Sequence, residues 1–444
     1  MNVLFRSPLG ALLARPWVDR AGLFGLQRWY LPLSRLWAAA NAAGEDAARF
    51  REEIGGPLPA FWSANRLRGP LARNTSAKLA ADTARRDWEA RIFDPRDAAD
   101  PGALDRQRRL AATRHLATRA WFYPLLHPRR PPLARWRIDP PGPMDLGLET
   151  DFDIAGVEVS RPFVTDGRRE YWLRAPTPSG RLQQRPGSGH LHARVVEPAD
   201  REPRATLILG SGLCLEFDLL SVARDPAMRL VAQGWRVIES ISPYHGLRAM
   251  PCYYGGEPFF ALGPTSSIDL ILGQASEWAM LVAWSRARFG GKVAVAGISM
   301  TSFVAQQLAS HCHLWPAEAR PDAAMLISHS GRIEDVTFGG TLAAMLGLDG
   351  ALTDAGWSPQ LLAPLSRAID PAERPSLPPS RIVSVLGETD RWLPFGDGLA
   401  VARRWGLPEA NVFRYPLGHL GMPVQLTRDQ APFERLARVL AEAR

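Results

Sequence analysis

The sequence predicts an α/β fold in which a mostly parallel sheet is covered by helices on both faces. Two observations predict it. From about residue 205 onward, short apolar runs rich in β-branched residues alternate with helical stretches, as in a parallel sheet. Within this region a strand over residues 293–296 leads through Ser299 directly into a helix that begins at Met300. In such sheets, ligands are expected at the carboxyl ends of the strands.

Composition sets the broad class of the protein. With 444 residues, 46% hydrophobic and 22% charged, the chain is long enough for one large domain and an appendage. No uncharged apolar run is long enough to cross a bilayer, and arginines interrupt the N-terminal apolar segment, so we expect neither a transmembrane helix nor a secretory signal. The three cysteines, Cys214, Cys252 and Cys312, lack metal spacing and favour reduced thiols in the cytoplasm.

The net charge of +8 is concentrated in the N-terminal third, where residues 1–150 hold 24 Lys and Arg against 15 Asp and Glu. Within residues 15–37, arginines alternate with the apolar side chains Trp17, Leu23, Phe24, Trp29, Tyr30 and Trp37. This mixture predicts peripheral contact with an anionic membrane surface. The alternatives are arginine-rich codon usage and packing of the aromatic side chains onto the sheet. We expect no nucleic-acid partner.

Residues 1–145 are predicted to form a helical N-terminal extension, including a polar, alanine-rich helix over residues 76–91. The proline-rich stretch 129–143 is a stiff connector and marks the boundary to a second domain over residues 146–444. This domain opens with strands over residues 169–175 and 190–197, which we expect to pair antiparallel at the sheet edge.

The elements that lead up to Ser299 follow in order. A strand over residues 205–209 leads into a glycine-containing turn, and a helix with apolar residues from Phe217 to Val231 follows. Then come a strand over 235–240, a long loop over 247–264 at the expected substrate entrance, and a helix over 267–289.

Beyond the helix that begins at Met300, the strand pattern resumes. Strands are predicted over residues 323–328, 381–386 and 411–415, with a closing helix over 431–443. Between the first two of these strands, residues 331–379 read as a helical insertion bounded by prolines. We predict that this insertion, over about residues 331–379, is a lid above the carboxyl edge of the sheet.

The turn at Ser299 indicates the α/β-hydrolase fold. In that fold the nucleophilic serine lies in a sharp turn between a strand and a helix, the nucleophile elbow, with the pattern Gly-x-Ser-x-Gly. Residues 297–301 read Gly-Ile-Ser-Met-Thr. The second glycine is replaced by Thr301, so we expect a small neighbour or a slightly opened turn at that position. The competing interpretation is an ordinary turn whose serine caps the helix.

A catalytic acid and base follow in the order that α/β-hydrolases use. Asp390 lies after the penultimate predicted strand, and His419 lies after the last one. A serine needs a base to take its proton, and the base needs a carboxylate to hold its tautomer, so Ser299, His419 and Asp390 form a candidate triad. Glu334 and Asp335, after the preceding strand, are the alternative acid.

Backbone N–H groups of Met300 and of Leu213 or Gly212 are the candidate oxyanion hole, because they follow the nucleophile and the glycine-containing strand end. Three further residues at strand ends are candidate pocket-lining residues: Tyr244, His245 and His329. His311, Cys312 and His313 lack further ligands at suitable spacing, so no metal and no other cofactor is expected.

Several motifs together resemble one known family. They are Gly-Ser-Gly at 210–212, Ser-Pro-Tyr-His-Gly at 242–246, the long helix with its Ser-Glu-Trp segment, and Gly-Ile-Ser-Met at 297–300. From residue 205 to the chain end, the sequence resembles the α/β-hydrolase domain-containing protein 18 family. The family elbow GISMGG reads GISMTS here, and its PYYG reads PYHG. The resemblance implies a serine hydrolase acting on an ester, with a lipid as one candidate substrate.

Taken together, the residues predict a serine hydrolase that cleaves a carboxylic ester through an acyl-enzyme on Ser299. Two alternatives remain open at this point. The same triad can transfer the acyl group to an alcohol instead of water. A non-catalytic binding scaffold is the alternative from another class, because Thr301 departs from the usual elbow.

Overall fold

A single mixed sheet forms the centre of the computed structural model, which describes residues 15, 17–54, 62–126, 131–213 and 224–443. In this part of the chain the sheet has ten strands in the order β1-β3-β4-β6-β5-β7-β8-β9-β10, with β2 paired to β3. The strands are β1 (Glu158–Val159), β2 (Phe163–Thr165), β3 (Arg168–Pro176), β4 (His190–Pro198), β5 (Ala205–Leu209), β6 (Trp235–Ser240), β7 (Lys292–Ile298), β8 (Ala323–Ile327), β9 (Ile382–Gly387) and β10 (Val412–Tyr415).

The six strands β6, β5, β7, β8, β9 and β10 run parallel to one another. In contrast, β3 and β4 pair antiparallel, and β4 also runs antiparallel to β6. The predicted edge pair and the predicted parallel sheet are therefore confirmed. With β4 running against the parallel strands, a crossover between β5 and β6, and a strand-turn-helix junction after β7, the chain has the α/β-hydrolase fold. The carboxyl ends of β7, β8, β9 and β10 meet along one edge.

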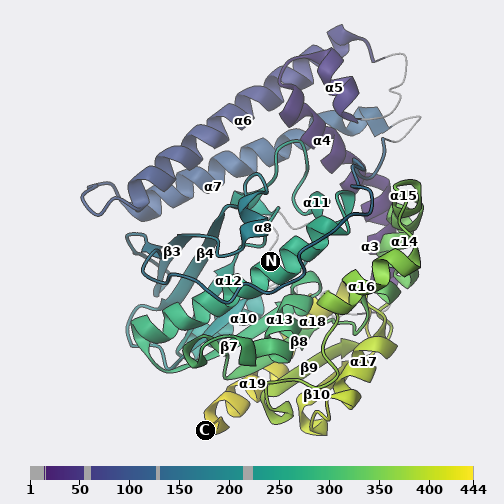
Figure 1. Ribbon diagram of the computed structural model, residues 1–444. Coiled ribbons are helices and arrows are strands. Elements are labelled where there is room, and N and C mark those ends of the chain that lie inside the picture. The colour runs from purple at the N-terminus through teal and green to yellow at the C-terminus, as the bar shows by residue number, and fades with distance from the viewer. Residues whose placement is uncertain (1–14, 16, 55–61, 127–130, 214–223, 444) are drawn as a thin grey trace.

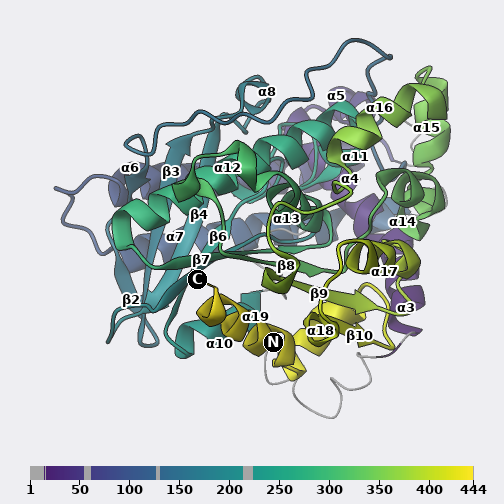
Figure 2. The same ribbon diagram turned by 60° about the horizontal axis from the view of Figure 1, so that its bottom comes forward.

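Helices cover both faces of the sheet, as the alternation of elements predicts (Figure 2). One face carries α12 (Thr265–Phe289) and α13 (Met300–His311), and the other carries α10 (Arg224–Ala232), α18 (Gly421–Arg428) and α19 (Ala431–Glu442). The remaining helices beside the sheet are α8 (Gly180–Gln183), η3 (Gly246–Arg248), α11 (Glu257–Ala261), η4 (Cys312–Leu314), η5 (Ala317–Ala319), α17 (Phe395–Arg404) and η8 (Glu409–Asn411).

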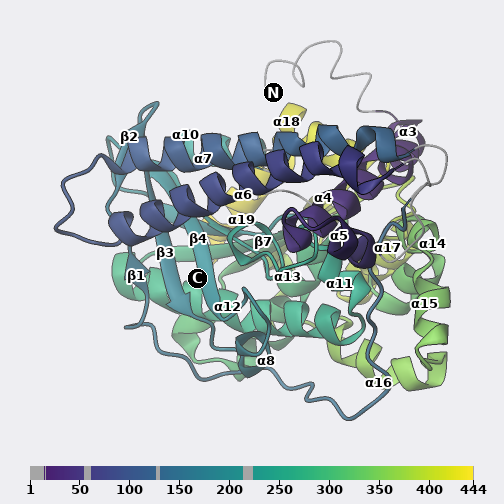
Figure 3. The same cartoon turned by 90° about the horizontal axis from the view of Figure 1, so that it is seen from above.

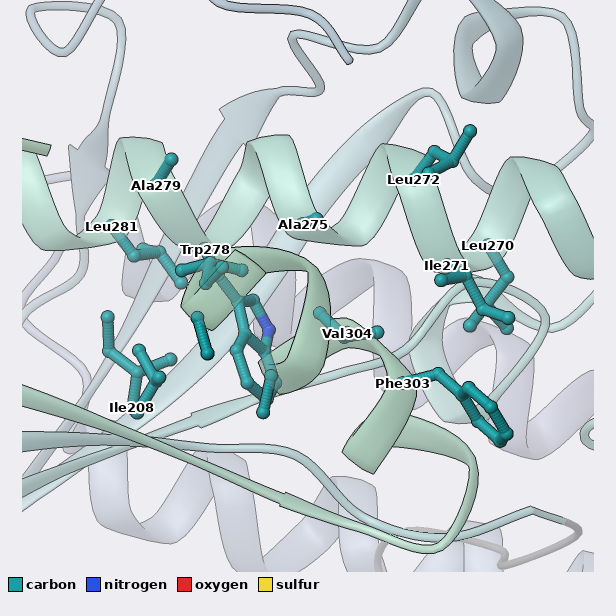
Figure 4. Packing of buried hydrophobic residues seen from close by; sticks show 14 of the residues in the cluster. Ile208, Leu270, Ile271, Leu272, Ala275, Trp278, Ala279, Leu281, Phe303 and Val304 are labelled. Atoms are coloured by element: carbon teal, nitrogen blue, oxygen red, sulfur yellow. The ribbon is translucent and has the colours of Figure 1, made fainter. Parts of the chain in front are cut away.

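Two separate cores hold these layers together, because successive side chains of a strand point to opposite faces. In β7, Val293 and Val295 pack into the core under α12 and α13, while Ala294 and Ala296 pack into the core under α19. Figure 4 shows the first core, in which Trp278 of α12 lies against the sheet near Ile208 of β5. Buried apolar side chains therefore pack against both faces of β7, which fixes its position from both sides.

The N-terminal third is helical, as predicted, and its helices are α3 (Trp17–Gly25), η1 (Leu26–Tyr30), α4 (Leu31–Ala43), α5 (Ala47–Ile54), α6 (Ala64–Ile92), α7 (Pro101–Ala117) and η2 (Thr118–Leu126). Helices α6 and α7 lie side by side as a long hairpin (Figures 1 and 3). Helix α6 is longer than the predicted helix because it continues through Pro70. Trp88 of α6 packs edge-on against Trp172 of β3, which joins this hairpin to the sheet.

The region predicted as a lid contains η6 (Asp335–Gly339), α14 (Thr341–Leu346), α15 (Leu348–Asp354) and α16 (Pro359–Ile369), and η7 (Pro379–Arg381) leads into β9. The predicted loop over 247–264 is partly helical, because η3 and α11 fall within it. Of the helix predicted from Phe217, residues up to 223 lie outside the described residues. Within the described part of the chain, no helix is long and apolar enough to span a membrane.

Candidate active site

Ser299 occupies a strained turn between β7 and α13. Its backbone has φ 56° and ψ −116°, a conformation that L residues rarely adopt, and its side chain is almost fully buried. Gly297 permits this turn, because a Cβ there would lie 2.0 Å from the carbonyl oxygen of Thr301. The predicted elbow is therefore present in the backbone, with the serine at the N-terminus of a buried helix.

Thr301 is accommodated in the elbow by a small neighbouring residue, which is one of the two arrangements expected from the sequence. A Cβ on Gly210 would lie 2.7 Å from the Thr301 Cβ, so glycine at that position gives the threonine its space. The Thr301 hydroxyl also accepts a hydrogen bond from the N–H of Ile298 at 2.9 Å and lies 3.1 Å from the Ile298 carbonyl oxygen. Thr301 thus closes the turn from within.

The structure brings the three candidate triad residues together. Ser299 Oγ lies 2.8 Å from His419 Nε2, and His419 Nδ1 lies 2.8 Å from Asp390 Oδ2. The other carboxylate oxygen of Asp390 accepts hydrogen bonds from the N–H groups of Trp392 at 2.9 Å and Leu393 at 3.2 Å. This arrangement leaves one oxygen to fix the imidazole tautomer in which Nδ1 carries the proton.

The alternative acids, Glu334 and Asp335, have other surroundings. Glu334 lies in the wall of the cavity beside Ser299, and Asp335 pairs with Arg332 at 3.4 Å. His419 instead contacts Asp390 directly. The geometry therefore favours the acid after the penultimate strand.

The surroundings of His419 favour its protonated form when the neighbouring carboxylates are charged. Burial lowers the pKa of His419, but the charge of Asp390 and the hydrogen bond to it, together with the charge of Asp19, raise that pKa above its ordinary value. The ring of Trp392 stacks on the imidazole, with 4.8 Å between ring centroids and 10° between planes. An imidazolium between a carboxylate and an aromatic face is stabilised by both.

Two backbone segments meet at Ser299 as candidates for binding an oxyanion. Met300 begins α13, and the first N–H groups of a helix have no partner within the helix. Gly212 lies beside the serine, because a Cβ on it would be 3.4 Å from the Ser299 Cβ. Leu213 lies in the wall of the same cavity. The predicted residues thus surround the serine, while residues 214–223 lie outside the described chain.

A cavity of about 520 Å³ opens onto Ser299 and His419. Its wall is dominated by aliphatic and aromatic side chains from three regions of the chain. The lid region contributes Leu342, Leu346, Leu352, Leu362, Leu365 and Ile369. The N-terminal helices contribute Leu26, Tyr30 and Leu31, and the segment before α12 contributes Phe259 and Phe260. Such a cavity suits a long apolar group held next to the serine.

Solved structures with a related backbone include several esterases, all at low similarity. They include a cold-adapted esterase from an Arctic intertidal metagenomic library (14% identity, TM-score 0.42, covering 64% of this chain and 98% of that chain). Others are acetyl xylan esterase 1 from Thermoanaerobacterium sp. (14%, 0.42, 61% and 87%) and the bacterial brefeldin A esterase (18%, 0.39, 68% and 80%). Such low TM-scores carry no argument about function.

No protein-family model and no curated protein matches the sequence. The resemblance to the α/β-hydrolase domain-containing protein 18 family therefore has no support from a family model or from a curated relative. The assignment to the α/β-hydrolase fold rests on the strand order and on the turn at Ser299.

The prediction that Tyr244, His245 and His329 line the pocket is wrong for the cavity at Ser299. Tyr244 is fully buried in the core, and burial raises the pKa of its hydroxyl. His245 Nδ1 lies 2.9 Å from the Pro243 carbonyl oxygen, and burial lowers the pKa of His245 to about 4. His329 bonds to Ser384 at 2.8 Å, and burial lowers its pKa to about 3. None of the three lies in the wall of this cavity, because a strand-end position does not fix the direction of a side chain.

His311 and His313 face each other with 6.4 Å between ring centroids. Among the described residues, no three or more His, Cys, Asp or Glu side chains are grouped so that they could hold a metal ion. Cys252 and Cys312 carry free thiols.

Sequence reasoning missed two residues at the site. Trp392 stands two positions after Asp390, and a tryptophan in an acid-bearing loop is the signal that could have identified it. Asp19 of α3 accepts hydrogen bonds from the N–H groups of His419 and Leu420, the latter at 2.8 Å. Its only signal is a single acid within an apolar helix, which does not reveal a partner 400 residues away.

The hydroxyl of Thr301 generates a first prediction. Thr301→Val keeps the shape but leaves the buried N–H of Ile298 without its acceptor, so the free energy of unfolding should fall by about 1–3 kcal/mol. Thr301→Ser keeps the hydroxyl, so its free energy of unfolding should fall by less. Its rate of ester hydrolysis should be closer to that of wild type. Urea unfolding monitored by circular dichroism measures both variants. A Val variant as stable as the Ser variant would show that the hydroxyl is dispensable.

Proposed function

We propose that this protein is a serine hydrolase that cleaves carboxylic esters through an acyl-enzyme on Ser299. The observation that carries the proposal is the continuous contact from Ser299 through His419 to Asp390, with both distances at 2.8 Å, at the wall of an apolar cavity. A serine, a histidine and an aspartate in this contact order form the arrangement that activates a hydroxyl for acyl transfer.

In the proposed reaction, Ser299 Oγ attacks the ester carbonyl carbon while His419 Nε2 takes the hydroxyl proton. Asp390 holds the Nδ1 proton and stabilises the imidazolium. The oxyanion accepts hydrogen bonds from the N–H of Met300 and from that of Gly212 or Leu213. His419 then donates its proton to the leaving alcohol, and a water activated by the same histidine releases the acid.

The proposed substrate is an ester with a long apolar acyl chain, such as a lipid ester. The cavity beside Ser299 has a wall of leucine, isoleucine and phenylalanine side chains, which lowers the free energy of an alkyl chain relative to water by about 0.8 kcal/mol per buried methylene. Residues 331–379, whose helices form much of that wall, would act as a lid over the site. The N-terminal extension and the hydrolase domain would each contribute to the same cavity.

The triad generates the second prediction. On p-nitrophenyl butyrate, Ser299→Ala and His419→Ala should each lower kcat by on the order of 10³ or more, with a smaller fall for Asp390→Asn. Asp335→Asn is the matched control and should retain activity, because Asp335 contacts Arg332 rather than His419. A collapse in Asp335→Asn with an unchanged Asp390→Asn would move the acid to the preceding strand. Transfer of the acyl group to an added alcohol would identify an acyltransferase.

The third prediction concerns chain length. Ala343 of α14 is buried and forms part of the cavity wall, so Ala343→Trp should fill the cavity and shift the preference from p-nitrophenyl palmitate toward the butyrate. Ala344→Trp, on the exposed side of the same helix, is the matched control and should keep the wild-type preference. The ratio of kcat/KM for the two esters is the measurement. An equal ratio in both variants would mean that the acyl chain binds elsewhere.

We also propose that α3 and η1 contact an anionic membrane surface. Trp17, Phe24 and Trp29 are 49%, 58% and 41% exposed, and Arg20 is exposed beside them. Aromatic rings suit the headgroup boundary, and each basic residue there adds about 1 kcal/mol. Leu26 of the same segment lies in the cavity wall, so an ester in the membrane would meet the site close to this surface.

Liposome co-sedimentation supplies the fourth prediction. The triple variant Trp17→Ala, Phe24→Ala, Trp29→Ala should lose binding to vesicles that contain phosphatidylserine, while Trp121→Ala with Tyr123→Ala should retain it as a control for other exposed aromatic side chains. Wild-type binding should weaken as salt is raised, because screening reduces the attraction between exposed charges and the membrane. Point variants are preferred to deletion, since Arg35 of α4 forms a buried ion pair with Glu257. The proposal would be contradicted if the wild-type protein did not co-sediment with these vesicles at low salt.

A further inference from the structure

We propose that Asp19, from the N-terminal helix α3, is a positioning residue for His419, so that this helix forms part of the active site. The inference rests on the proposed function, because it assigns a role in the reaction of that site. It concerns a contact between the beginning of the described chain and the last loop after the sheet. None of the triad residues comes from the N-terminal third, so the helix would add a component that the sheet does not supply.

The carboxylate of Asp19 binds the histidine loop through two backbone groups. One oxygen accepts the N–H of His419, and the other accepts the N–H of Leu420 at 2.8 Å. Asp19 is only 8% exposed. Both oxygens of one buried side chain are therefore used to hold two successive peptide groups, one of them belonging to the histidine itself. Rotation of that loop would break both hydrogen bonds.

Two glycines allow α3 to approach the loop this closely. A Cβ on Gly418 would lie 2.1 Å from a carboxylate oxygen of Asp19, and a Cβ on Gly22 would lie 2.1 Å from Leu420 Cδ1. A larger residue at position 418 would displace the whole Asp19 carboxylate, whereas one at position 22 would require the Leu420 side chain to move. Glycine at position 418 is therefore the main requirement for this contact.

The charge of Asp19 also acts on the imidazole. Two carboxylates face His419, Asp390 from the loop after β9 and Asp19 from α3, while Ser299 and Trp392 supply neutral contacts. Burial lowers the pKa of His419, and the charges of Asp390 and Asp19 raise it. For Asp19 the direction is opposite: burial raises the pKa of its carboxyl group. The hydrogen bonds from the N–H groups of Leu420 and His419 and the charge of His419 partly offset this rise. When His419 takes the proton of Ser299, a charged Asp19 stabilises the imidazolium.

A purely structural role for Asp19 makes different predictions. If Asp19 only tethers α3, its removal should lower stability and leave the titration of His419 unchanged. If it positions and polarises His419, removal should also lower kcat and shift the pH dependence. Because the neutral imidazole is the active base, losing a nearby negative charge lowers its pKa and moves the acid limb of kcat/KM to lower pH.

The fifth prediction compares Asp19→Asn with wild type on p-nitrophenyl butyrate. The variant loses the charge and one of the two N–H acceptors, so kcat should fall about tenfold or more and the acid limb should move to lower pH, with little change in KM. Asp46→Asn is the matched control, because Asp46 accepts the N–H groups of Ala48 and Arg49 at an exposed position in the same N-terminal region. Its pH profile should equal that of wild type.

A folded Asp19→Asn with an unchanged pH profile would overturn the inference, even if its stability fell. Should that variant fail to fold, Asp19→Ser, which keeps a hydroxyl acceptor without the charge, is measured in the same way. The imidazole titration of His419, followed by NMR in wild type and variant, does not require turnover. Wild type without any esterase activity would remove the proposed function, whereas an equal His419 pKa in both proteins would remove the link to Asp19.

Discussion

The hydrogen bond between Ser299 and His419 is the interaction on which the account of this protein depends. It joins two loops that are 120 residues apart, and it forms because β7 and β10 end at the same edge of the sheet. Strand order alone brings these ends close, since β8 and β9 are the only strands between them in the described sheet. The remaining precision comes from local constraints: the strained turn at Ser299, and the two backbone N–H groups that fix Asp390.

The cavity above this edge is assembled from segments that are distant in sequence. Helices inserted after β8 form one part of the wall, and the N-terminal segment from α3 to α4 forms another. The N-terminal segment therefore has three faces with different surroundings: exposed aromatic side chains outside, aliphatic side chains in the cavity wall, and Asp19 on the histidine loop. A movement of this segment would alter the cavity and the position of His419 together, because α3, which carries Asp19, continues directly into η1, whose Leu26 and Tyr30 lie in the cavity wall.

Much of the fold could be predicted from the sequence because its signals are local. Strands such as 205–209 and 235–240 are short apolar runs bounded by turns, and their order defines the candidate triad. Three kinds of feature could not be predicted. Side-chain direction at strand ends decided against His245 and His329. Helix α6 continues through Pro70, although a proline in the sequence favours a helix end. Contacts across the whole chain, such as that of Asp19, leave no periodic pattern. Thr301 lies between these cases, since its neighbour Gly210 was expected only as some small residue.

In the proposed reaction, Ser299 is a nucleophile activated by its contact with His419. The most direct measurement is reaction of the purified protein with a fluorophosphonate, followed by mass spectrometry of the digested protein to locate the modified side chain. We expect a single adduct on Ser299 that forms at a rate dependent on neutral His419, and no adduct in the Ser299→Ala variant. A folded wild-type protein that forms no adduct, or one modified equally in the Ser299→Ala variant, would contradict the claim.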